Sequence, residues 1–155
     1  AQVELLRRRL ERLADVYLAD HGVDVRALDG AGAAGGLAGG LAVAGARLVG
    51  GFDAVADELD LPDLIEGADL VVTGEGFLDE QSFEGKVVGG VADLARAARV
   101  PCVAVVGEVV PDLAPEVGSG LEVVSLVARV GDERARADTA RCIEEAVADV
   151  LAARG

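Results

Sequence analysis

The sequence predicts an α/β protein, with a Rossmann-like parallel sheet flanked by helices in a single domain spanning residues 1–155. Two valine-rich apolar runs, at 68–73 and 100–107, are typical of buried strands. Between them, apolar side chains recur at three- and four-residue spacing over 87–98, which indicates a helix. A strand, a helix and a strand at this separation predict a βαβ unit with parallel strands and a right-handed crossover. Ligands are therefore expected at the carboxyl ends of the strands.

The other elements follow from periodicity and from Gly and Pro positions. Residues 2–20 have an amphipathic helical pattern, which His21 and Gly22 close. The remaining expected elements, in chain order, are a strand or extended connector at 23–28, a Gly/Ala-rich segment at 30–46, a short strand at 47–50, a helix at 52–59 that stops near Pro62, a strand at 121–126 and a closing amphipathic helix at 133–153.

Composition narrows the class of partner. The net charge of −14 argues against binding to nucleic acid or to an anionic membrane surface. The N-terminus is Arg-rich rather than apolar, which is unlike a signal peptide, so a cytoplasmic location is expected. Cys102 and Cys142 lack metal-ligand spacing and are expected to be buried, inert thiols. The chain has no Met and begins at Ala1, which is compatible with processing or with a fragment of a longer protein.

The first glycine-rich stretch, DGAGAAGGLAGGLAVAG at 29–45, allows several interpretations. Gly30, Gly32 and Gly35 match the dinucleotide pattern G-x-G-x-x-G, but 23–28 is too polar for the central strand that should precede it. A membrane span needs about 20 apolar residues, more than this stretch offers. A closely packed small-residue helix is the plainest alternative. We favour a turn whose N–H groups face an anion at a helix start, followed by glycines that permit tight packing.

The second stretch, TGEGFLDEQSFEGK at 73–86, follows the first predicted strand. It is not a Walker A loop, which would require Gly in place of Glu80 and Ser or Thr in place of Val87. Gly74 and Gly76 are expected to let the backbone leave the strand with unusual dihedral angles and approach a ligand. Gly85 then precedes a helix start, which is a position suited to phosphate.

Charged and polar residues of the second stretch are candidates for catalysis. Lys86 is the only lysine among 14 cationic side chains, and a compact ammonium suits phosphate contact. Glu75 and Asp79 are candidates for binding Mg2+ or for accepting a hydroxyl proton. Gln81 and Ser82 are expected to orient a ligand or to cap the next helix. Glu80 and Glu84 fit a solvated acidic loop.

Together, "GAGAAGGLAGGL" (30–41), "TGEGFLDEQSFEGK" (73–86) and "PCVAVVG" (101–107) resemble the C-terminal part of the class I glycerate kinases, from about Leu5 to the end of the chain. The resemblance implies phosphorylation of D-glycerate by ATP and Mg2+, typically to 2-phosphoglycerate. This chain has Phe77 where the family usually has Arg, Ser82 where Thr is usual, and Asp29 where Pro is common. Loss of that Arg removes a possible charge clamp beside the phosphates.

Members of that family are more than twice as long and carry an additional α/β domain, with the active site between domains. The resemblance therefore implies that this chain supplies one side of the active-site cleft, with the N-terminal domain or a second copy of the chain as its partner. For phosphoryl transfer we assign catalytic roles to Asp79, Lys86 and Glu75, with Asp79 and Glu75 as candidates for Mg2+ or for the acceptor hydroxyl. ATP or substrate contacts are implied for Gly30, Gly32, Gly35, Gly36, Thr73, Gly74, Gly76, Gln81, Ser82 and Gly85.

Two further functions stay open at this point. One is a non-catalytic remnant of a kinase that binds a phosphorylated metabolite, which the short chain and Phe77 favour. The other is a dinucleotide-binding oxidoreductase domain, which rests on the match of Gly30, Gly32 and Gly35 alone.

Overall fold

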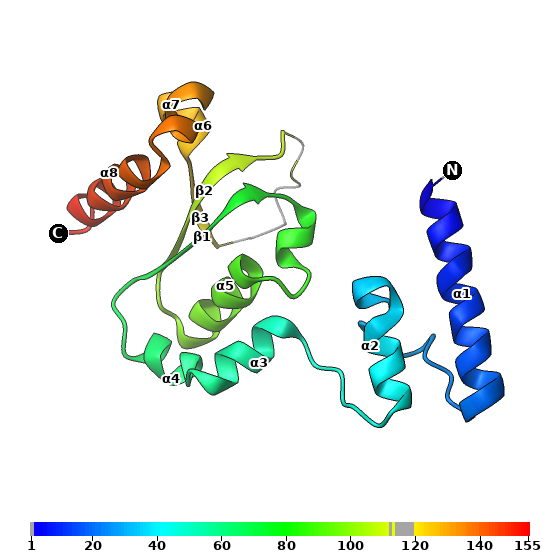
Figure 1. Cartoon of the computed structure of the whole chain (residues 1–155). Helices are drawn as coiled ribbons and strands as arrows, with labels where there is room; N and C mark the ends of the chain where they lie inside the picture. The colour runs from blue at the N-terminus through cyan, green and yellow to red at the C-terminus, as the bar shows by residue number, and fades with distance from the viewer. Residues whose placement is uncertain (1, 112, 114–119) are drawn as a thin grey trace. The chain divides into compact units, whose positions relative to one another are not determined.

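The computed structural model describes residues 2–111, 113 and 120–155. The chain forms two compact units, residues 1–50 (unit 1) and residues 51–155 (unit 2), which Figure 1 draws as ribbons. Each unit has its own buried residues and is described by itself. The single-domain expectation stays a prediction. Within the described residues, no helix is both long enough and apolar enough to span a membrane.

Unit 1 is built on two helices, α1 (Gln2–His21) and α2 (Ala33–Val43). His21 ends α1 as expected, and Gly22 follows it with a positive φ of 71°. The segment 23–28 is a connector without strand structure, and 47–50 is not a strand. The core of the unit consists of three buried residues, Ala14, Val25 and Ala31. Tyr17 and Val43 are among the partly buried side chains that pack against them.

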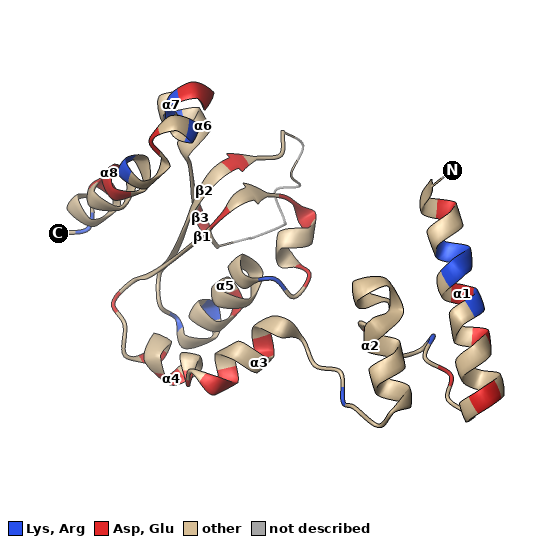
Figure 2. Ribbon diagram, viewed as in Figure 1, with Lys and Arg blue, Asp and Glu red and all other residues tan. Residues whose placement is uncertain are grey.

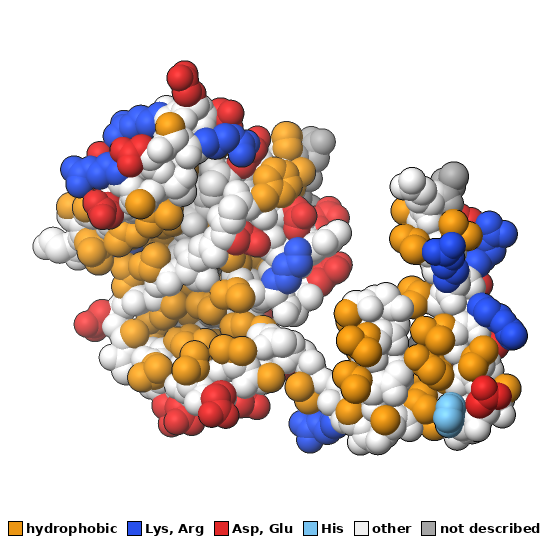
Figure 3. All heavy atoms as spheres, viewed as in Figure 1, with side chains coloured by type: hydrophobic (Ala, Val, Ile, Leu, Met, Phe, Trp, Pro, Cys, Tyr) orange, Lys and Arg blue, Asp and Glu red, His pale blue; other side chains and the backbone are white. Residues whose placement is uncertain are grey.

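Glycines bring α2 close to α1. A Cβ atom at Gly36 would lie 2.8 Å from Cδ2 of Leu13, and one at Gly40 would lie 2.8 Å from the Tyr17 hydroxyl oxygen. Glycine at these two positions leaves room for the ends of the Leu13 and Tyr17 side chains against α2, so the prediction that the later glycines permit tight packing is confirmed. Leu37 and Leu41 of α2 are exposed, and Figure 3 shows hydrophobic side chains on the visible face of this unit.

Unit 2 contains a three-stranded parallel sheet. Its strands are β1 (Val71–Leu78), β2 (Cys102–Val109) and β3 (Glu122–Ser125), in the order β1-β2-β3. Val71 pairs with Cys102, and Val103 pairs with Glu122. The predicted α/β class and parallel βαβ unit are confirmed. β2 is central in the sheet, and its first five residues are buried.

Helices cover both faces of the sheet. α5 (Val87–Ala98) packs on one face, where its residues join Ala104 and Val106 of β2 in the core. α8 (Thr139–Ala152) packs on the other face, against Val103 and Val105. The successive residues of β2 alternate between these two faces, as expected for a strand buried on both sides. Cys102 and Cys142 are buried and free, as predicted.

Four shorter helices complete the unit: α3 (Gly51–Glu58), α4 (Leu61–Glu66), α6 (Leu126–Val130) and α7 (Asp132–Ala137). α3 confirms the helix expected at 52–59. α3 ends before Pro62 as expected, and Pro62 then lies in the first turn of α4, which the sequence did not predict. The closing helix expected at 133–153 is interrupted at Asp138 and forms α7 and α8. Figure 2 shows acidic residues along α3 and α4.

Candidate functional site

The stretch that looked like a loop after Thr73 is strand. β1 continues through Gly74 and Gly76 to Leu78, so the predicted strand end was five residues short. Neither glycine has a positive φ, so the expectation of unusual dihedral angles was wrong. A Cβ atom at Gly74 would lie 2.3 Å from the carbonyl oxygen of Val105, and one at Gly107 would lie 2.4 Å from that of Gly76. These glycines allow close contact between the backbones of β1 and β2.

Glu75 lies in the carboxyl half of β1, opposite Val106. Alternation along the strand places it on the same face as Val71, which is the face covered by α5. The Glu75 oxygen Oε1 is buried and has no hydrogen-bond partner among the residues that the structure describes. A buried carboxylate oxygen without a donor is costly, and it would be satisfied by a cation or a bound hydroxyl.

Asp79 follows β1 and caps the short 3-10 helix η1 (Glu80–Phe83). Its oxygen Oδ1 accepts hydrogen bonds from the Ser82 backbone N–H at 3.1 Å and from the Ser82 hydroxyl, 3.2 Å away. The Asp79 N–H in turn lies 3.0 Å from the Ser82 hydroxyl oxygen. The other carboxylate oxygen, Oδ2, has no hydrogen-bond partner within the described part of the chain. The carboxylate is therefore held in place with one oxygen free for a ligand.

The polar residues beside Asp79 differ in their access to solvent. Ser82 is fully buried, and its hydroxyl serves Asp79 within η1 rather than capping the helix that follows. Gln81 is exposed and Thr73 is half-buried. Ligand contact by Ser82 stays a prediction that its burial does not favour.

Lys86 is the N-cap residue of α5, and Gly85 precedes it with a positive φ of 76°. Its side chain is exposed and forms no salt bridge with any residue in the described ranges. The Lys86 ammonium is thus accessible, and its contact with a phosphate stays a prediction. Gly89 follows in α5, where a Cβ atom would lie 2.8 Å from the Ser82 carbonyl oxygen, so η1 packs directly on α5.

The Gly30–Gly36 segment of unit 1 faces a pocket of about 450 Å³ beside α1. Gly30, Gly32 and Gly36 line it, while Gly35 does not, and Arg7 and Arg26 are the cationic side chains at its wall. Three consecutive residues have positive φ, from Ala34 at 51° to Gly36 at 92°, so the segment is a turn and not a regular helix start.

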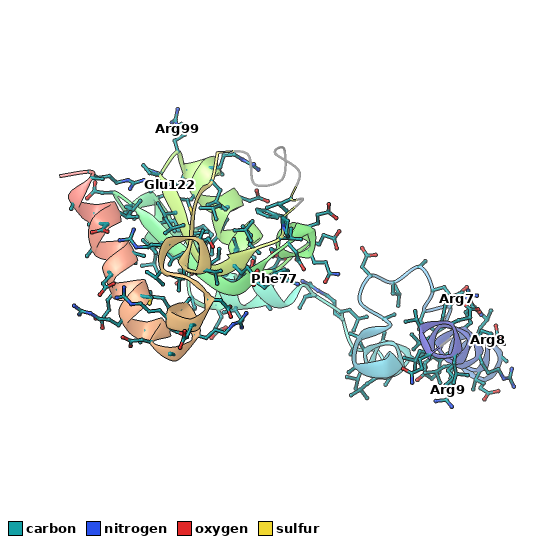
Figure 4. The ribbon with its side chains drawn as sticks, turned by 90° about the horizontal axis from the view of Figure 1, so that it is seen from above. Arg7, Arg8, Arg9, Phe77, Arg99 and Glu122 are labelled. Carbon is teal, nitrogen blue, oxygen red and sulfur yellow. The ribbon has the colours of Figure 1, made fainter. Side chains whose placement is uncertain are left out.

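Several groups of this pocket already have partners. The N–H groups of Ala31 and Ala33 donate within the turn, to Leu28 and Gly30. Arg7 pairs with Glu4 at 2.8 Å, and the hydrogen bond to that carboxylate raises the pKa of Arg7. Arg26 pairs with Asp24, which raises the pKa of Arg26 in the same way. Figure 4 looks along α1 and shows Arg7 on its surface. The anion site expected in this segment stays a prediction.

Sequence reasoning missed a second cleft, of about 380 Å³, in unit 2. It lies at the carboxyl ends of β1 and β2, where ligands of parallel sheets bind. Its polar side chains are Glu108, Arg136 and Thr139, and Phe77 forms part of its wall. Because Arg136 and Thr139 are more than 25 residues from β2 in sequence, no local motif could have identified the cleft.

A preformed cluster of metal ligands is not present in the described residues. In 2–111, 113 and 120–155, no group of three or more His, Cys, Asp or Glu side chains could hold a metal ion. Mg2+ usually takes only one or two protein carboxylates and completes its shell with water and phosphate oxygens. Glu75 and Asp79 are therefore sufficient in kind for a magnesium site.

A family model for the glycerate kinase family matches residues 1–154. The glycerate 2-kinase of Escherichia coli (strain K12) is 36% identical over 133 residues, which cover 84% of this chain and 35% of that protein. An uncharacterised protein of Mycobacterium tuberculosis is 42% identical over 109 residues, covering 70% of this chain and 29% of that one. The chain spans about a third of the length of these curated relatives.

A solved structure shows the same similarity in three dimensions. It is a crystal structure described as glycerate kinase 2 from Salmonella typhimurium LT2, with a TM-score of 0.58 and 33% sequence identity. The match covers 92% of this chain and 37% of that one.

Proposed function

Because this chain belongs to the glycerate kinase family, we propose that it takes part in the phosphorylation of D-glycerate by ATP, with 2-phosphoglycerate as the product. Relatives named glycerate kinase and glycerate 2-kinase support this reaction. They are about three times as long as the matched segment, so the proposal gives this chain one part of the site.

The observation that carries the proposal is the buried Oε1 of Glu75, which has no hydrogen-bond partner in residues 2–111, 113 and 120–155. It lies near the carboxyl end of a parallel strand, where phosphates and their cations bind in α/β proteins. A carboxylate oxygen is the ligand type that Mg2+ prefers, and Glu75 would hold the ion, which leaves Asp79 for the acceptor hydroxyl. When bound, Mg2+ would neutralise negative charge on the phosphates of ATP.

Lys86 binds and neutralises the phosphoryl group that is transferred. Its ammonium is exposed and unpaired among the described residues, and it extends from the start of α5, where backbone N–H groups favour anions. Phosphoryl transfer depends mainly on positioning and on charge stabilisation, so a single mobile cation at this point contributes strongly.

Asp79 accepts the proton of the attacking hydroxyl. Ser82 orients the carboxylate through Oδ1, which leaves Oδ2 to receive that proton. The glycerate oxygen forms a bond to the γ-phosphorus while the bond from that phosphorus to the bridging oxygen of ADP breaks. The products are phosphoglycerate and ADP, with the proton on Asp79.

The Gly30–Gly36 turn of unit 1 has a separate proposed role, which is contact with a phosphate or with the glycerate carboxylate. Arg7 and Arg26 at the adjoining pocket support an anionic ligand, although each already pairs with an acidic side chain. Since this assignment is independent of Glu75, its failure would leave the roles of the unit 2 residues unchanged.

One alternative keeps a specific observation in its favour. Phe77 stands where the resemblance implies Arg, which supports a remnant that binds the nucleotide without transferring phosphate. The structure does not support the oxidoreductase alternative. A dinucleotide-binding G-x-G-x-x-G motif directly follows a β-strand, and residues 23–28, which precede Gly30, do not form a strand.

Calorimetric titration of the chain with MgATP and with NAD tests the proposal. We expect MgATP to bind with Mg2+ dependence, Glu75→Gln to weaken that binding at least about tenfold, and NAD not to bind. Glu80→Gln is the matched control, because Glu80 is exposed in the same segment. NAD binding without MgATP binding would contradict the proposal. MgATP binding without turnover on D-glycerate would support the remnant.

A further inference from the structure

The unit 2 cleft of about 380 Å³ combines an exposed aromatic ring with an apolar floor. Phe77 is 48% exposed at its wall, near the end of β1 (Figure 4). Leu126, Val127 and Ala135 supply apolar surface from α6 and α7. The volume falls within the range of small-ligand pockets, roughly 300–1,000 Å³.

The charges around this cleft do not favour a phosphate. Arg136 is its only cationic lining residue within the described part of the chain. The Arg136 guanidinium lies 3.7 Å from the Glu108 carboxylate and 2.5 Å from that of Asp132. Two carboxylates therefore compensate one cation, and a phosphate placed here would meet net negative charge. An uncharged group fits these surroundings better.

The polar atoms of the cleft favour a ligand that donates hydrogen bonds. The Thr139 hydroxyl donates to the Ala135 carbonyl oxygen at 2.7 Å, so its own oxygen is left as an acceptor. The Glu108 carboxylate is also an acceptor. An amino group on a flat ring can donate to either oxygen while the ring stacks on Phe77.

We propose that this cleft binds the adenine base of the nucleotide donor, with the ring stacked on Phe77 and its amino group donating to Glu108 or Thr139. This inference rests on the proposed function, because it names the subsite for the base of the same ATP. It also gives Phe77 a role of its own: an aromatic stacking surface at a position where the resemblance implies Arg.

Calorimetry with three magnesium-bound diphosphates on the 155-residue chain separates base binding from phosphate binding. The ligands are ADP, IDP and pyrophosphate, since IDP has a carbonyl in place of the adenine amino group. We expect ADP to bind at least about fivefold more tightly than pyrophosphate, which is the lower end of typical ring-stacking contributions. We also expect IDP to bind more weakly than ADP.

Variants identify the surface. Phe77→Ala should remove most of the advantage of ADP over pyrophosphate, whereas Phe77→Tyr should retain it because the ring is kept. Val72→Ala is the control, since Val72 is exposed on the same strand and is not among the cleft-lining residues. Thr139→Val should reduce the preference for ADP over IDP. Circular dichroism of each variant verifies folding.

Equal binding of ADP and pyrophosphate would overturn this inference and leave the proposed phosphate site intact. An ADP advantage that survives Phe77→Ala would also overturn it. If none of the three ligands bound, both this inference and the proposed function would be wrong.

Discussion

The Ser82 N–H donates to Oδ1 of Asp79 at 3.1 Å, and the Asp79 N–H lies 3.0 Å from the Ser82 hydroxyl oxygen. This reciprocal pair forms a capping box around η1. It holds a carboxylate at the end of a parallel strand and leaves its second oxygen without a partner among the described residues. One pair of residues thus links local backbone structure to the proposed proton acceptor.

Replacing Ser82 by Ala should lower both stability and activity. The change removes the partner of the half-buried Asp79 N–H, so the free energy of unfolding should fall by about 1–2 kcal/mol. Urea denaturation measures this. Glu80→Ala, an exposed change in the same turn, is the control. Equal stability of the two variants would show that the capping box contributes nothing.

Gly74→Ala should destabilise the sheet far more than Gly76→Ala. A Cβ atom at Gly74 would lie 2.3 Å from a backbone oxygen of β2, whereas one at Gly76 would meet no atom of the described residues within 4 Å. Backbone cannot move aside as a side chain can, so we expect a difference of at least about 2 kcal/mol in the free energy of unfolding. Similar unfolding midpoints for the two variants would contradict the close contact of β1 with β2.

Glu75→Gln should stabilise the ligand-free protein while weakening nucleotide binding. The substitution keeps the shape of the side chain but removes a carboxylate whose buried oxygen has no donor among the residues that the structure describes. We expect the free energy of unfolding to rise by about 1 kcal/mol. Thermal unfolding without and with MgATP measures both effects. A destabilised variant would indicate that Glu75 serves the fold rather than a ligand.

The Cys102 thiol should make stability fall in alkaline solution. Burial raises the pKa of Cys102 above its ordinary value of 9.0. As pH rises, the Cys102 thiol therefore ionises at a lower pH in the unfolded chain than in the folded protein. This stabilises the unfolded chain and lowers the free energy of unfolding above about pH 9. Cys102→Ala should show a weaker pH dependence over that range by urea denaturation. Identical profiles for the two proteins would be incompatible with a desolvated thiol.

Residue patterns alone predicted the parallel sheet, because two apolar runs and the helical spacing between them describe local structure. They could not predict where β1 ends. Gly74 and Gly76 are typical of a loop, and only the contact of Gly74 with the Val105 carbonyl oxygen, about 31 residues away, shows why glycine is needed inside this strand. The loop propensity of the glycines was overridden by the packing of β1 against β2.

The candidate site was predictable in part. A lone lysine among arginines identified Lys86, and its exposed position fits that interpretation. The pairing of Asp79 with Ser82 follows from a short-range capping pattern that was assigned to the following helix instead of to η1. The cleft formed by Glu108, Arg136 and Thr139 depends on tertiary structure, so the sequence contained no local signal for it.

The rate of ADP formation from MgATP in the presence of D-glycerate tests the central claim most directly. The account predicts that glycerate-dependent turnover by the complete enzyme to which these residues contribute falls at least about 100-fold in Lys86→Ala and in Asp79→Asn, with Glu80→Gln unchanged. Rates of the two variants within about threefold of the unaltered enzyme would contradict the assigned roles, since groups that act on a transferring phosphoryl are worth several kcal/mol.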